Sequence, residues 1–422
     1  MKYREILWLL ACISIVQGAC EATRKRSEIR ELSETERNSF IDSVLELKRQ
    51  GKYDDFVLQH MVGFPFAHNS PLFFPWHRQY LLNFENTLRK INPNVTVPYW
   101  DWTLDSQAPE ASPIFKWFGG NGKGEDHCVD DGPFANWETS VPKKKCLQRQ
   151  FDLQSGLISP LQSPELLNED IDTSKNYSTL QMNIEMGTHS LVHVGIGGNE
   201  GDMSFEFSSN DPIFWLLHSF VDKIWTIWQT RDPQNLLSYD GINPITNKAV
   251  ALSDHLDLFD AKVGDVMDIK SLCYQYSKIP KIHMPSGQIS HTTAPTTTPS
   301  HTSIIRPTQS PKPNVLGIIK RFNRNTSTLM NLNKRTVLYG NIPAYFDIYG
   351  GPAPDDREEE FQLRIPMGLP QQFIDRMGYS TNLVRAIEIR HADLTQRINQ
   401  LKDYISPVSL ARKIETERVF FN

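Results

Sequence analysis

The sequence predicts a mainly α-helical protein with a loop-rich periphery, followed by a small C-terminal α+β module. Apolar residues recur at helical spacing in three segments that begin near Ser33, Pro75 and Asp211. Residues 100–180 are rich in Gly, Pro and Asp, which indicates loops between the second and third of these helices. Residues 285–313 consist mainly of Ser, Thr and Pro, a composition that cannot bury a core and indicates an extended linker.

Length and charge restrict the class of protein. The chain has 422 residues, more than the roughly 250–300 that a single core usually holds, so more than one domain is expected. Its 44 Lys and Arg against 49 Asp and Glu give no support to a nucleic-acid partner. Beyond the N-terminus no run approaches the roughly 20 apolar residues of a membrane helix, so no membrane anchor is expected.

The N-terminus predicts the compartment. Lys2 and Arg4 precede an apolar stretch over residues 6–16 and the small residues 18–19. This layout is typical of a secretory signal peptide, with a buried N-terminal helix as the alternative. We therefore expect a secreted, extracellular protein organised as follows: a signal peptide over 1–19, a main helical domain over 20–284, a linker over 285–315 and the C-terminal module over 316–422.

The cysteines fit an oxidising compartment. Removal of the signal peptide removes Cys12 and leaves four cysteines, an even number that favours disulfides. Cys128 and Cys146 bracket one loop and are expected to pair, which leaves Cys20 for Cys273. Glycosylation is expected at three sequons, at Asn94, Asn176 and Asn325.

Local signals place the predicted helices and strands. Ser33 and Glu36 match a capping box, and Asp211 followed by proline matches a helix start. In the C-terminal module, short strands are expected over 335–340, 345–350 and 361–365. A final helix carries apolar residues on one face from Leu383 to Ile405, and it could pack internally or against a second copy of the chain.

Six of the 12 histidines form a pattern that indicates metal binding. A single histidine on an apolar helix face is usually a core residue. Here, however, His77 and His218 each lie on the apolar stripe of a predicted helix, and His189 and His193 lie one turn apart. Together with His60 and His68 they make a set that would be costly to bury without a shared partner, and metal ions supply such a partner.

The residues around these histidines favour copper. No Cys lies beside them, and no Glu-x-x-His pair recurs as in carboxylate di-iron bundles. The spacing from His189 to His193 lacks the intervening Glu of zinc-protease helices. Two sets of three imidazoles suit copper, which prefers nitrogen ligands.

Three motifs resemble those of the tyrosinase family. Residues 74–81 read FPWHRQYL with a further histidine at 68, residues 98–102 read PYWDW, and residues 211–218 read DPIFWLLH. The resemblance covers about residues 40–235 and is to the type-3 dicopper proteins: tyrosinases, catechol oxidases and molluscan haemocyanin units. The layout of the whole chain is most similar to secreted animal tyrosinase-like proteins.

The resemblance implies a four-helix-bundle core that holds two copper ions and uses dioxygen as co-substrate. It also implies oxidation of o-diphenols to o-quinones and, as a further activity, hydroxylation of monophenols. Small phenols or catechols would be the substrates, with protein tyrosines as an additional class. The implied ligands are His60, His68 and His77 for the first copper and His189, His193 and His218 for the second.

Departures from the family pattern bear on the reaction. Many members carry a thioether-forming Cys where this chain has Phe66, so His68 is expected to be held less tightly. Leu217 replaces a histidine that neighbours a ligand without being one. Ser190 stands where efficient monophenolases often have Asn, and Phe205 matches a gate position that is Phe in plant catechol oxidases. Ser190 and Phe205 together favour diphenol oxidation.

Two carboxylates match supporting positions of the family. Glu185 matches a residue that orients a water and takes the phenol proton, and its alternative is a solvated helix-start Glu. Asp222 lies one turn after His218 and could accept an imidazole N–H. Its alternative role is a salt bridge to Lys223 or Arg231.

Three further hypotheses follow. The chain could be a reversible oxygen carrier, or a structural matrix protein that has lost catalysis, although all six ligands are present. In several relatives a C-terminal domain covers the active site. Residues after about 316 could do so here, with Tyr345, Phe346 or Tyr349 as the blocking aromatic residue.

Overall fold

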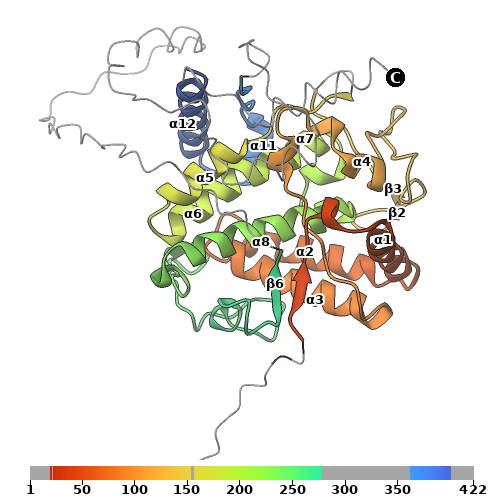
Figure 1. The fold of residues 1–422 in the computed structure, drawn as a ribbon, viewed down its shortest axis with the longest axis horizontal. Helices are drawn as coiled ribbons and strands as arrows, with labels where there is room; N and C mark the ends of the chain where they lie inside the picture. Colours follow the sequence, from red (N-terminus) through yellow and green to blue (C-terminus); the bar gives the residue numbers. More distant parts are fainter. Residues whose placement is uncertain (1–19, 21, 154–155, 278–361, 401–422) are drawn as a thin grey trace, which may run out of the picture. The chain divides into compact units, whose positions relative to one another are not determined.

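The computed structural model describes residues 20, 22–153, 156–277 and 362–400. The chain divides into two compact units, Met1–Ile279 with Arg364–Leu394, and Pro280–Leu363 with Thr395–Asn422. The helices that carry the predicted metal ligands belong to the first unit, and Figure 1 shows them at its centre.

Helices dominate the described residues, in agreement with the predicted fold class. The α-helices are α1 (Glu34–Arg49), α2 (Tyr53–Ala67), α3 (Phe73–Ile91), α4 (Pro113–Phe118), α5 (Pro164–Thr173), α6 (Tyr177–Asn183), α7 (Ser190–Gly197), α8 (Ile213–Arg231), α11 (Gln371–Arg376) and α12 (Thr381–Asn399). A π-helical turn, Ile184–His189, joins α6 to α7. Short 3-10 turns lie over 29–31, 102–105, 109–111, 202–204, 208–210, 233–235 and 263–266.

The predicted helix starts are confirmed, with small shifts. Ser33 and Glu36 form the reciprocal capping box at the start of α1. Helix α3 begins at Phe73, two residues before the expected proline. Helix α8 begins at Ile213, and the carboxylate of Asp211 accepts the backbone N–H of Ile213 at 3.0 Å, which satisfies one of the free donors of the first turn.

Helix α2 was not predicted, because Gly63 and Pro65 lie inside it. Proline interrupts the helical hydrogen-bond ladder, and glycine lowers helix propensity. Packing explains the glycine: a Cβ at Gly63 would lie 2.4 Å from Cζ2 of Trp76 on α3. Close approach between α2 and α3 thus outweighs the local propensity.

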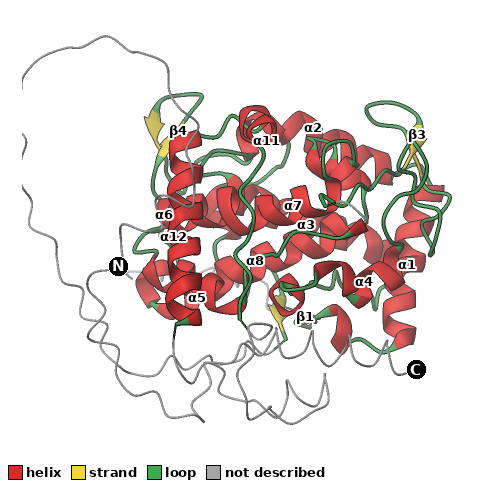
Figure 2. Ribbon diagram, turned by 90° about the horizontal axis from the view of Figure 1, so that it is seen from above, coloured by secondary structure: helices red, strands yellow, loops and turns green. Residues whose placement is uncertain are grey.

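The core forms where α3 packs against α8. Phe84 of α3 stacks on Trp215 of α8 with ring centroids 3.5 Å apart, and Phe74 stacks on Trp225 at 5.4 Å. All four side chains are buried. Figure 2 shows α3, α7 and α8 as neighbouring rods at the centre of this unit. These aromatic contacts fix the two helices from which the predicted ligands His77 and His218 project.

Short strands and disulfides secure the periphery. Strand β1 (Arg24–Arg26) pairs in parallel with β6 (Tyr274–Tyr276), β2 (Glu138–Thr139) pairs with β3 (Lys145–Cys146), and β4 (Ile242–Asn243) pairs with β5 (Lys248–Ala249). Cys128 is bonded to Cys146 and Cys20 to Cys273, as predicted. The second bond closes the pair β1–β6, so both ends of the catalytic part are joined.

The C-terminal segment Arg364–Leu394 packs as two helices on the catalytic part. Phe373, Ile374, Met377 and Val384 form an apolar cluster with residues of the π-helical turn and α7. The final helix was expected, and it packs internally. The expected strands over 335–340 and 345–350 lie outside the described residues, and residues 362–365 form no strand.

The predicted glycosylation sites, signal peptide and linker lie partly within and partly outside the described residues. Asn94 and Asn176 are exposed, as glycosylation requires, whereas Asn325 lies outside the described residues. The expected signal peptide and linker also lie outside them. Among the described residues, no helix is both long enough and apolar enough to cross a bilayer.

Candidate metal centre

The first three predicted ligands converge in a buried cluster. His60 lies in α2, His68 caps the C-terminus of α2, and His77 lies in α3. Their ring centroids are separated by 5.3 Å (His60–His68), 5.7 Å (His60–His77) and 4.8 Å (His68–His77). One nitrogen from each lies within 4.8 Å of the others, close enough for one metal ion to bind all three.

The second three form a matching cluster. His189 ends the π-helical turn, His193 lies in α7 and His218 in α8. Their centroids are 4.4 Å (His189–His193), 5.0 Å (His189–His218) and 5.6 Å (His193–His218) apart, and one nitrogen from each again lies within 4.8 Å of the others. All three side chains are buried.

The two clusters adjoin one another. His77 of the first stacks on His218 of the second with centroids 4.4 Å apart, and His68 lies 6.3 Å from His189. Helices α3 and α8 supply the stacked pair, so the aromatic contacts between these helices set the spacing of the clusters. The arrangement is that of a dinuclear centre.

Hydrogen bonds orient most of these imidazoles toward the centre. In four of them Nδ1 donates to a backbone carbonyl, which can only accept: His60 to Glu206 (2.7 Å), His77 to Phe73 (2.7 Å), His189 to Glu185 (3.2 Å) and His193 to Met203 (2.6 Å). The Nε2 atoms of the same four residues are buried without a partner. A metal ion at each cluster satisfies them.

The imidazoles are neutral, as metal ligands must be. Burial lowers the pKa of His60 to about 3 and that of His193 to about 4, and it holds the other four well below the ordinary value. Each ring therefore keeps a lone pair at neutral pH. Buried, neutral, all-nitrogen triads fit copper.

Copper removal is expected to lower the melting temperature of the folded protein by roughly 10 °C, because the buried Nε2 atoms lose their partner and ligand binding stabilises the native state. Thermal unfolding of copper-loaded and chelated protein measures the difference. The variant His193→Ala keeps the first triad and should lose part of this difference in melting temperature, whereas His255→Ala, at an exposed histidine outside both clusters, should keep all of it. An equal shift in both variants would contradict the assignment.

A break in helix geometry places His189. The turn Ile184–His189 is π-helical, and Gly187 within it has φ −100° and ψ −107°, outside the helical region. Such turns recur at functional sites. The carbonyl of Glu185 accepts from Nδ1 of His189 at 3.2 Å and from Oγ of Ser190 at 2.7 Å. The turn thus aims one ligand and buries the residue that follows.

Glu185 is buried and not solvated. Its carboxylate accepts the backbone N–H of Asn69 at 2.6 Å, the side-chain amide of Gln181 and the hydroxyl of Tyr379 at 3.3 Å. Burial raises its pKa to about 8, although these three donors act in the opposite direction. A carboxyl group with such a pKa can accept and return a proton near neutrality.

The two gate residues both contact the C-terminal segment. Ser190 is fully buried, with Oγ 3.4 Å from the hydroxyl of Tyr379. Phe205 stacks on Phe207 at 5.2 Å, and the guanidinium of Arg376 lies 4.0 Å above its ring. Arg376 also donates to the carbonyl of Ser204 at 2.7 Å. Neither Tyr379 nor Arg376 was predicted from the sequence to lie at these positions.

The expected bond between Asp222 and His218 is not formed, and neither alternative partner pairs with Asp222, since Lys223 donates to Tyr99 and Arg231 pairs with Asp172. Its carboxylate instead accepts from Arg78 and, at 3.4 Å, from Arg26. The hydroxyl of Tyr274 adds a bond at 2.7 Å. Asp222 is displaced toward these donors because two buried guanidinium groups need a counter-charge more than a neutral imidazole does. It connects α3, α8 and β1.

Aromatic side chains enclose the histidines. Phe214 lies 4.1 Å from His218 and 4.9 Å from His60, and Phe64 stacks on His68 at 4.2 Å. Phe64 was missed, although it precedes His68 by one helical turn in α2. Apolar rings on both clusters leave little room for water around the metal ligands.

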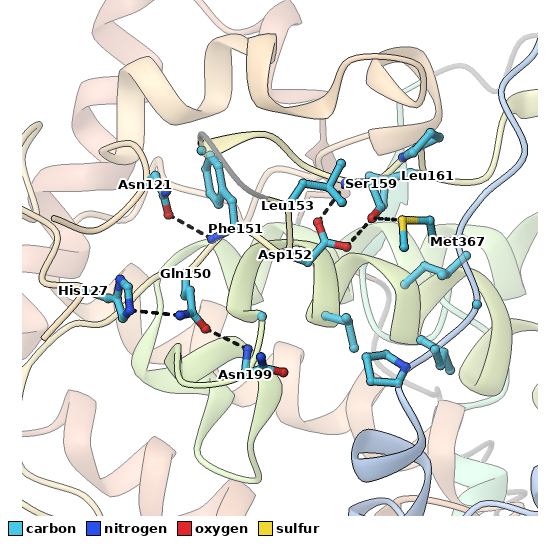
Figure 3. A pocket seen from close by; sticks show the side chains of 18 residues that line it. Asn121, His127, Gln150, Phe151, Asp152, Leu153, Ser159, Leu161, Asn199 and Met367 are labelled. Carbon is cyan, nitrogen blue, oxygen red and sulfur yellow. Dashed lines mark hydrogen bonds between the residues drawn. The ribbon is translucent and has the colours of Figure 1, made fainter. Parts of the chain in front are cut away.

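A separate pocket lies beside α7. Its cavity volume is about 410 Å³, and it is lined by Leu191 and Val194 of α7, by the loop around Gln150 and Asp152, and by residues 367–370 of the C-terminal segment. Figure 3 shows hydrogen bonds among the residues that line it, such as those of Gln150 with His127 and of Ser159 with Asp152. None of the six histidine ligands lines it, so this pocket is distinct from the metal centre.

A helical core with two adjacent buried histidine triads defines a dinuclear copper protein. Residues 50–231 match the common central domain of tyrosinase. The chain is 36% identical over 227 residues to a tyrosinase of Streptomyces glaucescens, covering 48% of this chain and 81% of that protein. A tyrosinase of Streptomyces antibioticus is 34% identical over 229 residues, with 48% and 82% covered.

A solved polyphenol oxidase structure from Thermothelomyces thermophila is 22% identical, with a TM-score of 0.47, and the match covers 61% of this chain and 89% of that one. The sequence relatives place the chain in the tyrosinase family. It is therefore a copper-dependent phenol oxidase of the tyrosinase and catechol oxidase type, and the two triads are arranged so that each could hold one of its two copper ions.

Proposed function

We propose that this protein oxidises small o-diphenols to o-quinones with dioxygen, outside the cell, and hydroxylates monophenols weakly. The observation that carries the reaction is the pair of buried triads, in which every imidazole has a buried ring nitrogen without a protein partner. The two copper ions, when bound, supply dioxygen activation. The chain itself positions the ions, excludes water and handles the proton.

The proposed roles of the surrounding residues follow from their contacts. Phe64 and Phe214 cover the imidazoles and exclude water, which limits side reactions. Glu185 would hold the proton released by the phenol at its carboxylate. Apolar rings enclose the centre, which favours small phenols over protein tyrosines as substrates.

The preference for diphenols is argued from Ser190 and Phe205. Ser190 donates to the backbone of Glu185, so it offers no amide to orient a water or phenol beside that carboxylate. Phe205 is partly exposed and stacked on Phe207, which supports its assignment as a bulky gate residue.

The variant Ser190→Asn is expected to raise the ratio of monophenol to diphenol oxidation about 10-fold, since a positioned proton acceptor contributes at least that much. Oxygen uptake with 4-methylphenol and 4-methylcatechol measures the ratio, in chains that end after Ser277 so that Tyr379 does not collide with the larger side chain. Ser190→Ala serves as the control and should leave the ratio low. Equal rates of oxygen uptake with the two substrates by the protein that retains Ser190 would contradict the proposed preference for diphenols.

The C-terminal segment is proposed to close the site. Tyr379 reaches both Glu185 and Ser190, and Arg376 covers Phe205, so a single segment contacts each residue assigned to substrate handling. Tyr379 takes the blocking role for which Tyr345, Phe346 and Tyr349 were considered from sequence, and those three lie outside the described residues.

Secretion is proposed from the sequence and supported by the cysteines. All four cysteines outside the expected signal peptide form disulfides, which persist in oxidising compartments. The oxygen-uptake experiment also tests the oxygen-carrier and matrix-protein hypotheses. They would be favoured if copper-loaded protein that lacks the C-terminal segment consumed no oxygen with any phenol.

A further inference from the structure

His68 differs from the other five ligands because it has neither a helical backbone conformation nor a hydrogen bond at Nδ1. It caps the end of α2 with extended backbone (φ −112°, ψ 157°), whereas the others lie within helices or the π-helical turn. Its Nδ1 is buried without a partner, and Phe66 excludes a thioether bond. His218 also lacks a ring hydrogen bond, but it lies inside α8 between the rings of His77 and Phe214.

The residue after His68 is held at two points. The backbone N–H of Asn69 donates to Glu185 Oε1 at 2.6 Å, and its side-chain amide donates to the carbonyl of Gly378 at 2.8 Å. Asn69 has a φ of +50°, a left-handed conformation that Asn tolerates better than most residues. Because the peptide unit between His68 and Asn69 is planar, a bond to the Asn69 N–H also fixes the main chain at His68.

Glu185 connects this loop to the second cluster. Its carbonyl accepts from His189 while its carboxylate holds Asn69, so one residue contacts a ligand of one triad and the neighbour of a ligand of the other. Gln181, one turn earlier, donates to the same carboxylate and keeps it in place.

We propose that Glu185, assisted by Gly378 of the C-terminal segment, positions His68 as a copper ligand by holding Asn69. This contact replaces, in this chain, the covalent restraint that Phe66 excludes. The proposal concerns copper retention, and it stands or falls independently of which phenol the enzyme oxidises.

The test measures copper loss from full-length, copper-loaded protein to a Cu(I)-specific chelator under a mild reductant. In Glu185→Ala, the copper ion at the first triad should leave about 10-fold faster than in the unmodified protein. This factor is at the lower end of the effect expected when a residue that supports a metal ligand is removed. The other copper should leave at its unmodified rate. Glu185→Gln should restore retention, because its side-chain oxygen still accepts from Asn69.

Three further variants sharpen the result. His68→Ala binds only at the second triad and so gives the reference rate for that copper. His255→Ala changes an exposed histidine outside both clusters and should release copper at the unmodified rate. Asn69→Gly keeps the N–H and the left-handed backbone but loses the bond to Gly378, so an intermediate rate is expected. Unchanged release in Glu185→Ala, or equal acceleration of both ions, would overturn the proposal, and unchanged release in Asn69→Gly would remove Gly378 from it.

Discussion

A chain that ends after Ser277 is expected to oxidise catechols roughly 10- to 100-fold faster than the full-length protein, because a closed state favoured by a few kcal/mol leaves only a small open population. The closed state is stabilised by Phe373, Ile374 and Met377, which are buried against the catalytic part. Initial rates of oxygen uptake with 4-methylcatechol, with copper in excess, measure the change.

Two variants separate closure from other effects of truncation. A chain that ends after Gln400 keeps α11 and α12 and should behave like the full-length protein. Tyr379→Phe keeps the apolar packing but loses the hydroxyl contacts to Glu185 and Ser190, so a smaller increase is expected. If the chain ending after Ser277 binds two copper ions and is no faster than the full-length protein, the segment does not restrict the site.

Replacement of Asp222 by Ala is expected to destabilise the protein by about 3–5 kcal/mol, since it leaves the buried guanidinium of Arg78 without its counter-charge and that of Arg26 with Glu85 alone. Arg78 and Arg26 are both fully buried and both lie on Asp222. The expected fall in melting temperature is roughly 10 °C. Thermal unfolding followed by near-ultraviolet circular dichroism measures it.

The matched control is Asp172→Ala, which breaks the partly exposed ion pair to Arg231 and should leave the melting temperature nearly unchanged. The effect of Asp222 also depends on pH. Burial acts to raise the pKa of Asp222, but Arg78 and Arg26 outweigh it and lower the pKa. Its stabilising contribution is therefore present above about pH 4 and is lost as the pH falls through the lowered value. Equal stability of the two variants at neutral pH would contradict this account.

Helices with strong local signals were predictable from the sequence. The capping box at Ser33 and the apolar stripes of α3 and α8 are local patterns, and each can be recognised within one short segment of sequence. Helix α2 could not be predicted in this way, because Gly63 and Pro65 argue locally against it and only the packing of Trp76 explains it. Local helix propensity does not predict a helix in which a close contact with another helix determines which residue is present.

The same distinction applies to the site. The six histidines were identifiable because their types and spacings are chemically unusual. The partners of Asp222 were not, since Arg26 is distant in sequence and the competition between a guanidinium and an imidazole depends on geometry. Tyr379 was equally hidden, because nothing near it in the chain indicates that it meets Glu185 across 194 residues.

The bond between Cys20 and Cys273 has a consequence for the enzyme after proteolytic cleavage. Any cut that frees the C-terminal segment creates a new chain end beyond Ser277, where a terminus would ordinarily fray and offer itself to exopeptidases. The disulfide and the pairing of β1 with β6 lie immediately inside that end. Trimming should therefore halt near Cys273, and the cleaved product should persist as one durable species with a fixed C-terminal boundary.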